Sequence, residues 1–118
     1  MQAMISRIGP SRYSATRNRI IIHNGVVTTV AVSPDKSTSL YRQAQAALGV
    51  LDQHLAEAGT DKSRLLMVMI YVADITQKSE FNRAWDEWVD RANLPVRACV
   101  GVSLEGDDLV ELVATAAC

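Results

Sequence analysis

Two apolar runs close the chain, and each contains one charged residue that is suited to chemistry. Arg97 stands in PVRACVGV and Glu111 in LVELVATAA, with the turn-like EGDD between the runs. A guanidinium is a planar, permanently charged fork that fits a carboxylate or a phosphate. A partly buried carboxylate that reaches water is a natural general base. The alternatives are an arginine that snorkels to solvent or pairs with a structural carboxylate, and a glutamate that faces water.

The spacing of these two residues indicates where they could act together. The runs predict a closing hairpin with strands over about 97–104 and 109–116 and a turn at Glu105–Asp108. Arg97 would then lie roughly 17–20 Å from Glu111, at ~3.3 Å per residue along the strand. We therefore expect a pocket that uses both residues to lie between subunits.

Other reactive side chains give weaker signals. Cys99 lies two residues from Arg97, on the same strand face, and a small buried thiol is favoured over a nucleophile because no histidine has a motif relationship to it. His23 and His54 offer no metal-ligand set, so neither a metal nor a cofactor is expected. Four arginines near the N-terminus suit either a phosphate-binding arm or, as we favour, a solvated edge: Arg7, Arg12, Arg17 and Arg19.

The elements that must position these residues follow from hydrophobic periodicity. RIIIHNGVVTTVAV (19–32) predicts a hairpin turning at Asn24-Gly25, because both turn positions need positive φ. Apolar residues at helical spacing predict helices over 39–58, with Gly59 as its C-terminal cap, and over 79–92. A strand over 64–72 separates the helices. With the closing strands, the order is ββαβαββ, an α+β domain.

Composition bounds the remaining possibilities. The 118 residues predict a single domain over 1–118, with 48% hydrophobic and 21% charged residues. The net charge of −1 gives no global attraction to nucleic acid or to an anionic membrane. No apolar run approaches the ~20 residues of a membrane span, and we expect a cytoplasmic protein because no export signal is visible.

Two strands predict an oligomer. Leu65–Val72 and Leu109–Ala116 are apolar at nearly every position, so both of their faces must be covered. Two helices can cover one face of the sheet, and another copy of the chain is the simplest cover for the other.

LPVRACV…VELVATA resembles the C-terminal signature of the Rid proteins, the reactive intermediate deaminases of the YjgF type. That signature is P-x-R-x-x-V, a short hairpin, and then V/I-E-I-x-A-x-A. The element order, AGTDKSRLLMVMIYVADI and FNRAW also fit, so the resemblance spans most of the chain. It implies a chorismate-mutase-like fold, with two helices on one face of a mixed sheet, and a homotrimer with ligand sites in the clefts between subunits.

The resemblance also implies hydrolysis of reactive enamines and imines, such as 2-aminoacrylate, to 2-oxo acids and ammonia. Arg97 would bind the substrate carboxylate, the Cys99 backbone N–H would assist, and Glu111 would orient and deprotonate water. Substrate contacts would also come from three further residues: Asn82 on the second helix, Thr29 on the second strand of the first hairpin, and Tyr13.

The chain departs from the family pattern around the expected pocket. Val30 replaces a glycine at which the backbone would approach the ligand, and this narrows the pocket. Tyr13 comes two positions later than usual, because Ser11 and Arg12 follow Gly9-Pro10. Two alternatives therefore stay open: a trimeric module that binds small carboxylates without turnover, and the ribonuclease or translation-inhibitor activity of some relatives.

Overall fold

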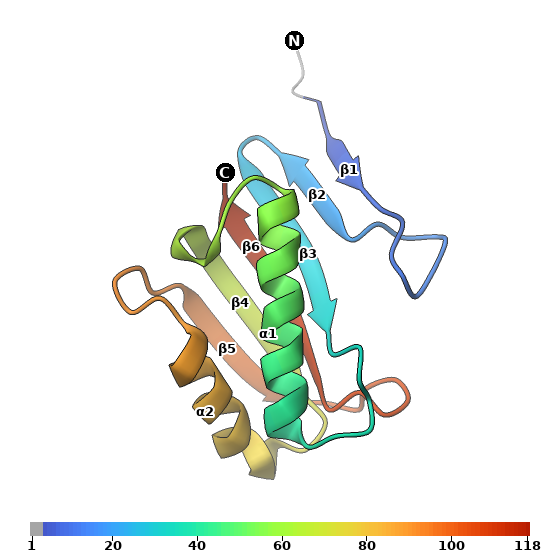
Figure 1. Cartoon of the computed structure of the whole chain (residues 1–118), viewed down its shortest axis with the longest axis vertical. Coiled ribbons are helices and arrows are strands. Elements are labelled where there is room, and N and C mark those ends of the chain that lie inside the picture. Colours follow the sequence, from blue (N-terminus) through green and yellow to red (C-terminus); the bar gives the residue numbers. More distant parts are fainter. Residues whose placement is uncertain (1–3) are drawn as a thin grey trace.

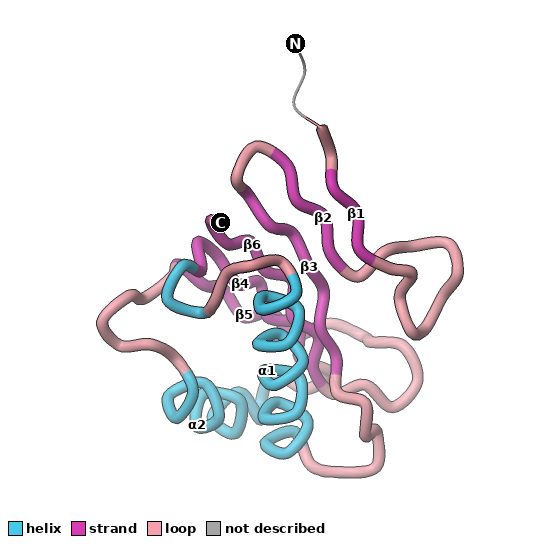
Figure 2. Tube along the Cα trace, turned by 45° about the horizontal axis from the view of Figure 1, so that its top comes forward, coloured by secondary structure: helices cyan, strands magenta, loops and turns pink. Residues whose placement is uncertain are grey.

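The computed structural model describes residues 4–118, in which two helices lie on one face of a six-stranded mixed sheet (Figures 1 and 2). Residues 1–3 of the predicted domain lie outside the described part. The sheet order is β1-β2-β3-β6-β4-β5. The elements are β1 (Ser6–Ile8), β2 (Ile20–His23), β3 (Val26–Val32), α1 (Leu40–Glu57), β4 (Leu65–Val72), α2 (Lys78–Trp88), β5 (Val96–Gly101) and β6 (Val110–Ala117), with 3-10 turns at Lys62–Arg64 and Ile75–Gln77.

The predicted order ββαβαββ is confirmed, and the short strand β1 precedes it. Asn24 and Gly25 have φ of 52° and 74°, as the turn between β2 and β3 requires. The side chain of Ser39 caps α1 by accepting a hydrogen bond from the Arg42 N–H. Gly59, at φ 79°, follows the end of α1 in the left-handed conformation predicted for it.

Helix α2 ends at Trp88, four residues before the predicted boundary at 92. Val89 already has extended backbone, with ψ of 144°. The Asp90 carboxylate accepts hydrogen bonds from the Ala92 N–H and the Asn93 side chain. A short acidic side chain that bonds the backbone ahead of it competes with helical hydrogen bonding, which explains the early end.

The predicted closing hairpin is wrong. Strand β5 is at one edge of the sheet and pairs in parallel with β4, whereas β6 lies between β3 and β4 and is antiparallel to both. Residues 102–109 cross the end of β4, where Val102 donates a hydrogen bond to the Val72 carbonyl and Ala73 donates one to the Leu109 carbonyl. A glycine-containing turn between apolar runs is typical of a hairpin, but this connection is long enough to step past one strand.

The two faces of the sheet differ. Phe81, Leu48 and Leu51 from the helices pack against the inward-facing residues of β3, β4 and β6. On the opposite face, which we call the open face, no described element of the chain covers the strands. Its exposed apolar residues are Val26, Val30, Met67, Val96 and Val100. The apolar residues of β4 and β6 are therefore divided between two surfaces: one set is buried under the helices, and the other set lies on the open face.

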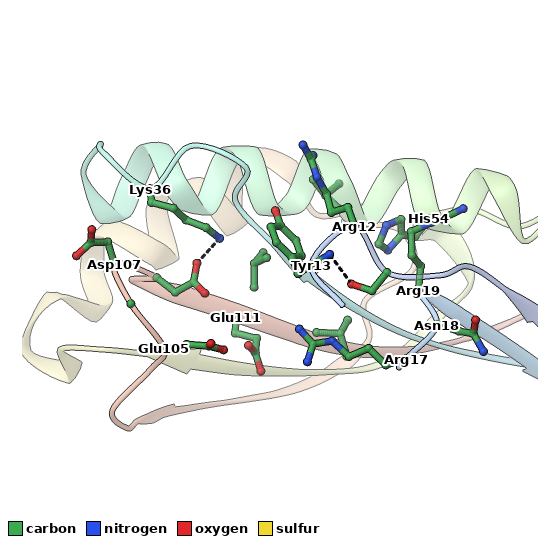
Figure 3. Close-up of a pocket in the computed structure, with 16 residues that line it drawn as sticks. Arg12, Tyr13, Arg17, Asn18, Arg19, Lys36, His54, Glu105, Asp107 and Glu111 are labelled. Carbon is green, nitrogen blue, oxygen red and sulfur yellow. Dashed lines mark hydrogen bonds and ion pairs between the residues drawn. The ribbon is translucent and has the colours of Figure 1, made fainter. Parts of the chain in front are cut away.

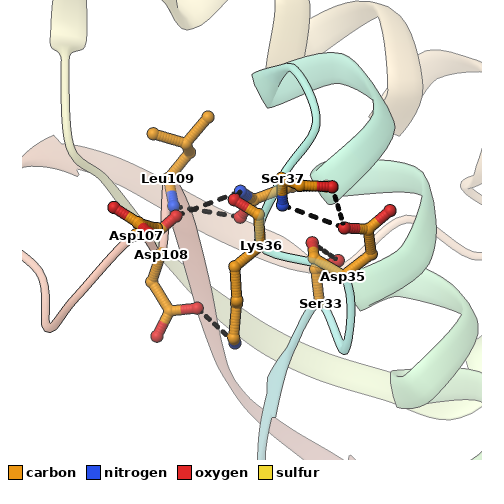
Figure 4. A network of polar contacts seen from close by, with 8 residues as sticks. Ser33, Asp35, Lys36, Ser37, Asp107, Asp108 and Leu109 are labelled. Atoms are coloured by element: carbon orange, nitrogen blue, oxygen red, sulfur yellow. Dashed lines mark hydrogen bonds and ion pairs between the residues drawn. The ribbon is translucent and has the colours of Figure 1, made fainter.

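Gln43 ties α1 to the two loops at one end of the sheet. Its side-chain amide is buried and donates to the carbonyls of Lys36 (3.3 Å) and Asp107 (3.1 Å), while its oxygen accepts the Leu109 N–H at 3.0 Å. Lys36 also forms an ion pair with Asp108, and the loops face each other across this network (Figure 4). These contacts hold the 105–109 loop against α1.

A second buried polar contact joins α1 to β3. The Thr29 hydroxyl donates to the Arg19 carbonyl at 2.8 Å and lies 2.9 Å from Nδ1 of His54. Because the hydroxyl proton is committed to Arg19, Nδ1 must carry the proton of this second bond. Burial lowers the pKa of His54 below its usual 6.5; the nearby Glu57 carboxylate opposes this shift, and the Arg19 guanidinium adds to it.

We expect Gln43→Leu to destabilise the protein by about 2–4 kcal/mol, because it leaves two carbonyls and one N–H without their partner. Urea denaturation at one fixed protein concentration measures the change. Gln45→Leu, on the exposed side of the same helix, is the control and should stay within about 0.5 kcal/mol of wild type. Equal stabilities for the two variants would contradict the bridging role of Gln43.

We expect stability to fall as the pH drops below about 6.5, in part because of His54. The depressed pKa means that the unfolded chain takes up the proton first, so protonation favours unfolding in this window. Urea midpoints between pH 7.5 and about 5.5 should fall more steeply in wild type than in His54→Gln. His23 and the carboxylates are common to both proteins, so parallel pH profiles would exclude His54 as the cause.

Candidate functional site

A cavity of about 580 Å³ lies where the 11–19 loop, β3, α1 and the 105–111 segment meet (Figure 3). Its lining includes three residues that the family resemblance assigned to the pocket: Glu111, Tyr13 and Val30. This volume is in the range of pockets that hold small molecules.

Glu111 is half-buried and belongs to the open face. On β6 it alternates with Val110 and Leu112, which are fully buried under the helices. Its strand neighbours in register are Val32 on β3 and Tyr71 on β4. A carboxylate held by the sheet, with apolar neighbours and an opening to water, can accept a proton from a water molecule in the cavity.

Backbone contacts hold the 9–19 loop, which carries Tyr13, in place. Ser11 donates to the Arg17 carbonyl at 2.8 Å, and Arg19 donates to the Ile8 carbonyl at 2.9 Å. A Cβ at Gly9 would lie 2.3 Å from Oδ1 and 3.0 Å from Cα of Asn18, so glycine at this position favours the close approach of the two arms. The loop is thus fixed against β2, and Tyr13 stands over the cavity rather than in solvent alone.

Charged groups around the cavity are unevenly distributed. Arginines come from the 11–19 loop, and carboxylates come from Glu105 and the residues that follow it (Figure 3). Two cations are neutralised: Lys36 pairs with Asp108, and Arg19 pairs with Glu57 at 2.7 Å. Lys36 also lies 5.0 Å from the centre of the Tyr13 ring, on which the cation can stack.

Arg97 forms a separate group with α2. Its Nη2 donates to the Asn82 side-chain oxygen at 2.6 Å, and its guanidinium carbon lies 5.2 Å from the Trp85 ring and 5.6 Å from the Phe81 ring. Cys99 lies on the same face of β5, as predicted, and burial raises the pKa of its thiol. A raised pKa disfavours the thiolate, which agrees with a structural thiol.

Arg97 and Glu111 do not meet within one chain, although the reason differs from the predicted one. Glu111 is level with Val100 two strands away, and Arg97 lies three residues before Val100. Their Cα atoms are therefore about 14 Å apart, from ~4.8 Å per strand and ~3.3 Å per residue. Moreover, Arg97 faces α2 whereas Glu111 faces the open side.

Thr29 belongs neither to the cavity around Glu111 nor to the contacts of Arg97 with α2. Only 2% of its surface is exposed, and its hydroxyl is engaged by Arg19 and His54. Strand alternation turns Thr29 inward and Val30 outward, so the Thr29 side chain does not line the cavity of the single chain, and its contact with substrate stays a prediction. Val30 lines the cavity beside Glu111, where its side chain occupies space that a glycine would leave empty.

The sequence did not single out several cavity residues as partners of Glu111. They come from a loop, a helix and the segment before β6: Arg17, Lys36, His54, Glu105 and Asp107. Only the cluster of arginines gave a usable signal. Within residues 4–118, no group of three or more His, Cys, Asp or Glu side chains is arranged to hold a metal ion. No helix in the described range is long and apolar enough to cross a membrane.

Comparison with known proteins places this arrangement in a family. The family model described as endoribonuclease L-PSP matches residues 5–118. A RutC family protein of Haemophilus ducreyi is 41% identical over 117 residues, covering 97% of each chain, and the RutC family protein YoaB of Escherichia coli is 31% identical over 85 residues, covering 72% and 75%. The crystal structure of NMB1025, a YjgF family member from Neisseria meningitidis, superposes with a TM-score of 0.88 at 29% identity, covering 97% and 94%. The chain belongs to the endoribonuclease L-PSP family, the YjgF/Rid family that its C-terminal motif predicted.

Proposed function

We propose that the protein hydrolyses reactive 2-imino acids and their enamine tautomers to 2-oxo acids and ammonia. The observation that carries the proposal is Glu111, a half-buried carboxylate on an otherwise apolar strand at the wall of a ligand-sized cavity. Family membership supports the reaction class. Both cysteines are unpaired, which suits a reducing cytoplasm as the location.

The reaction asks little of the protein beyond positioning. Water adds to the electrophilic carbon of the C=N bond while Glu111 accepts one of its protons. That proton passes to the nitrogen and gives a carbinolamine, which carries one hydroxyl and one amino group. The hydroxyl then gives up its proton, the amino group takes up a proton, and the C–N bond breaks, so that ammonia leaves as the new C=O bond forms. Holding the substrate carboxylate and aiming one water molecule at this carbon supply most of the acceleration. No redox partner or cofactor is needed for this balance.

We further propose that the complete site lies between subunits of a homotrimer. The open face is apolar, and Val96 and Val30 are 66% and 46% exposed in the single chain. Arg97 lies on the edge strand β5, so it can reach a neighbouring copy, whereas it cannot reach Glu111 of its own chain. In such a trimer, the β5 edge of one copy would lie beside the cavity of another and present its Arg97 there. The Cys99 backbone lies on the same edge and would add an N–H donor.

Two substitutions separate catalysis from binding. Glu111→Gln keeps the shape of the side chain but cannot accept the proton, so we expect turnover to drop on the order of 10²–10⁴-fold while 2-oxo acids bind as in wild type. Arg97→Lys keeps the charge but loses the bidentate fork, so it should weaken the binding of substrate and 2-oxo acids together. The measurements are 2-oxo acid release from freshly generated imines and calorimetric titration with a 2-oxo acid.

The outcomes distinguish the rival functions. A wild-type rate in Glu111→Gln would show that Glu111 is not the base. Binding of 2-oxo acids without acceleration of any imine would establish a binding module in place of the enzyme. Cleavage of RNA that survives Glu111→Gln would support the ribonuclease alternative.

Light scattering tests the trimer. We expect a mass near three times 12.9 kDa at micromolar concentration. Met67→Glu places a charge on the open face and should dissociate the trimer, because a charge is costly to bury without a partner. Leu94→Glu, an exposed apolar residue in the loop before β5, is the matched control and should leave the mass unchanged. A monomeric wild type would reject the trimer and, with it, the shared site.

A further inference from the structure

Arg17 presents an unpaired guanidinium in the same cavity as Glu111. The ion pairs of residues 4–118 are Arg19–Glu57 and Lys36–Asp108, so no carboxylate of the described chain neutralises Arg17. No side-chain hydrogen bond engages it either, and only its backbone carbonyl is used, by Ser11. Figure 3 shows its side chain extending along the cavity toward Glu111.

The other cations of the cavity are less suited to a ligand. Lys36 and Arg19 are neutralised by carboxylates. Arg12 lies 5.5 Å from the centre of the Tyr13 ring, and its side chain rises toward α1, away from Glu111 (Figure 3). Arg17 is therefore the cation that a ligand beside Glu111 would meet first.

The opposite end of the cavity repels anions. Glu105 and Asp107 lie there, beyond Glu111 as seen from Arg17, and the nearby cation Lys36 is already paired with Asp108 (Figure 3). An anionic group on a ligand is consequently favoured at the end of the 11–19 loop, while a group that gains positive charge, such as the protonated nitrogen of an imine, is favoured at the acidic end. The cavity is thus positive at one end and negative at the other, and a ligand with a neutral side chain would gain nothing from the positive end.

We propose that Arg17 binds a second carboxylate, so that the preferred substrates are dicarboxylic 2-imino acids, the imines of acidic amino acids. This inference rests on the proposed imine hydrolysis. The carboxylate next to the reacting carbon is assigned to Arg97 of a neighbouring copy, and the distal carboxylate goes to Arg17. A guanidinium suits this task because it offers two parallel N–H donors to one carboxylate. The backbone contacts of the 9–19 loop hold Arg17 in place before the ligand arrives.

Binding of product acids tests the assignment without turnover. Calorimetry should show that wild type binds 2-oxoglutarate at least about tenfold more tightly than 2-oxopentanoate, which has the same chain length and no second carboxylate. Arg17→Gln should weaken 2-oxoglutarate binding by roughly 10–100-fold and leave 2-oxopentanoate unchanged. Arg42→Gln, which removes the same charge from the start of α1, should alter neither. Equal affinities of wild type for the two acids would overturn the proposal.

The hydrolysis assay gives an independent readout. The imine of glutamate should be hydrolysed with a higher kcat/KM than the imine of its γ-methyl ester, and Arg17→Gln should remove this preference mainly through KM. If Arg17→Gln lowers kcat/KM equally for both, Arg17 binds the carboxylate beside the reacting carbon and the distal assignment is wrong. If neither imine is hydrolysed, the proposed function fails, while the calorimetric comparison still decides whether Arg17 selects dicarboxylates.

Discussion

One constraint governs this structure: the central strands of the sheet are apolar on both faces, but the described part of the chain has only two α-helices with which to cover them. Strand β6 lies between β3 and β4 and alternates between residues buried under the helices and residues that point to the open face. The helices cover one face of the sheet, and their leucines and Phe81 form the core together with residues of the strands. The other side carries exposed valines and Met67. An exposed apolar surface of this kind typically marks a contact site for another protein surface.

The same division of the sheet separates the two charged residues of the C-terminal motif. Arg97 is held against α2 by Asn82 and two aromatic rings, whereas the side chain of Glu111 lies on the open face. Within one chain the sheet itself stands between them. A site that uses both residues needs a second copy, and covering the open face supplies one. Assembly and chemistry would then depend on the same surface.

Hydrogen bonds to buried side chains give the cavity its shape. Gln43 joins α1 to the loops that carry Lys36 and Asp107, and Thr29 joins His54 to the backbone at Arg19. These bonds fix the acidic segment at one end of the cavity and the arginine-bearing loop at the other. The charge distribution around Glu111 is therefore a property of the folded core, because flexible loops would average it out.

Local sequence determined the elements: periodicity marked α1 and β4, Asn24-Gly25 marked the first turn, and the C-terminal motif identified Arg97 and Glu111. Each of these signals depends on residues near one another in the chain. The tertiary structure alone decided the position of β6 between β3 and β4, because strand order depends on long-range pairing that an apolar run does not encode. It also decided that Thr29 faces inward while Val30 and Arg17 face the cavity of Glu111. Which face a strand residue occupies is set by what packs on each side of the sheet, and that information is spread over α1, the 9–19 loop and β6.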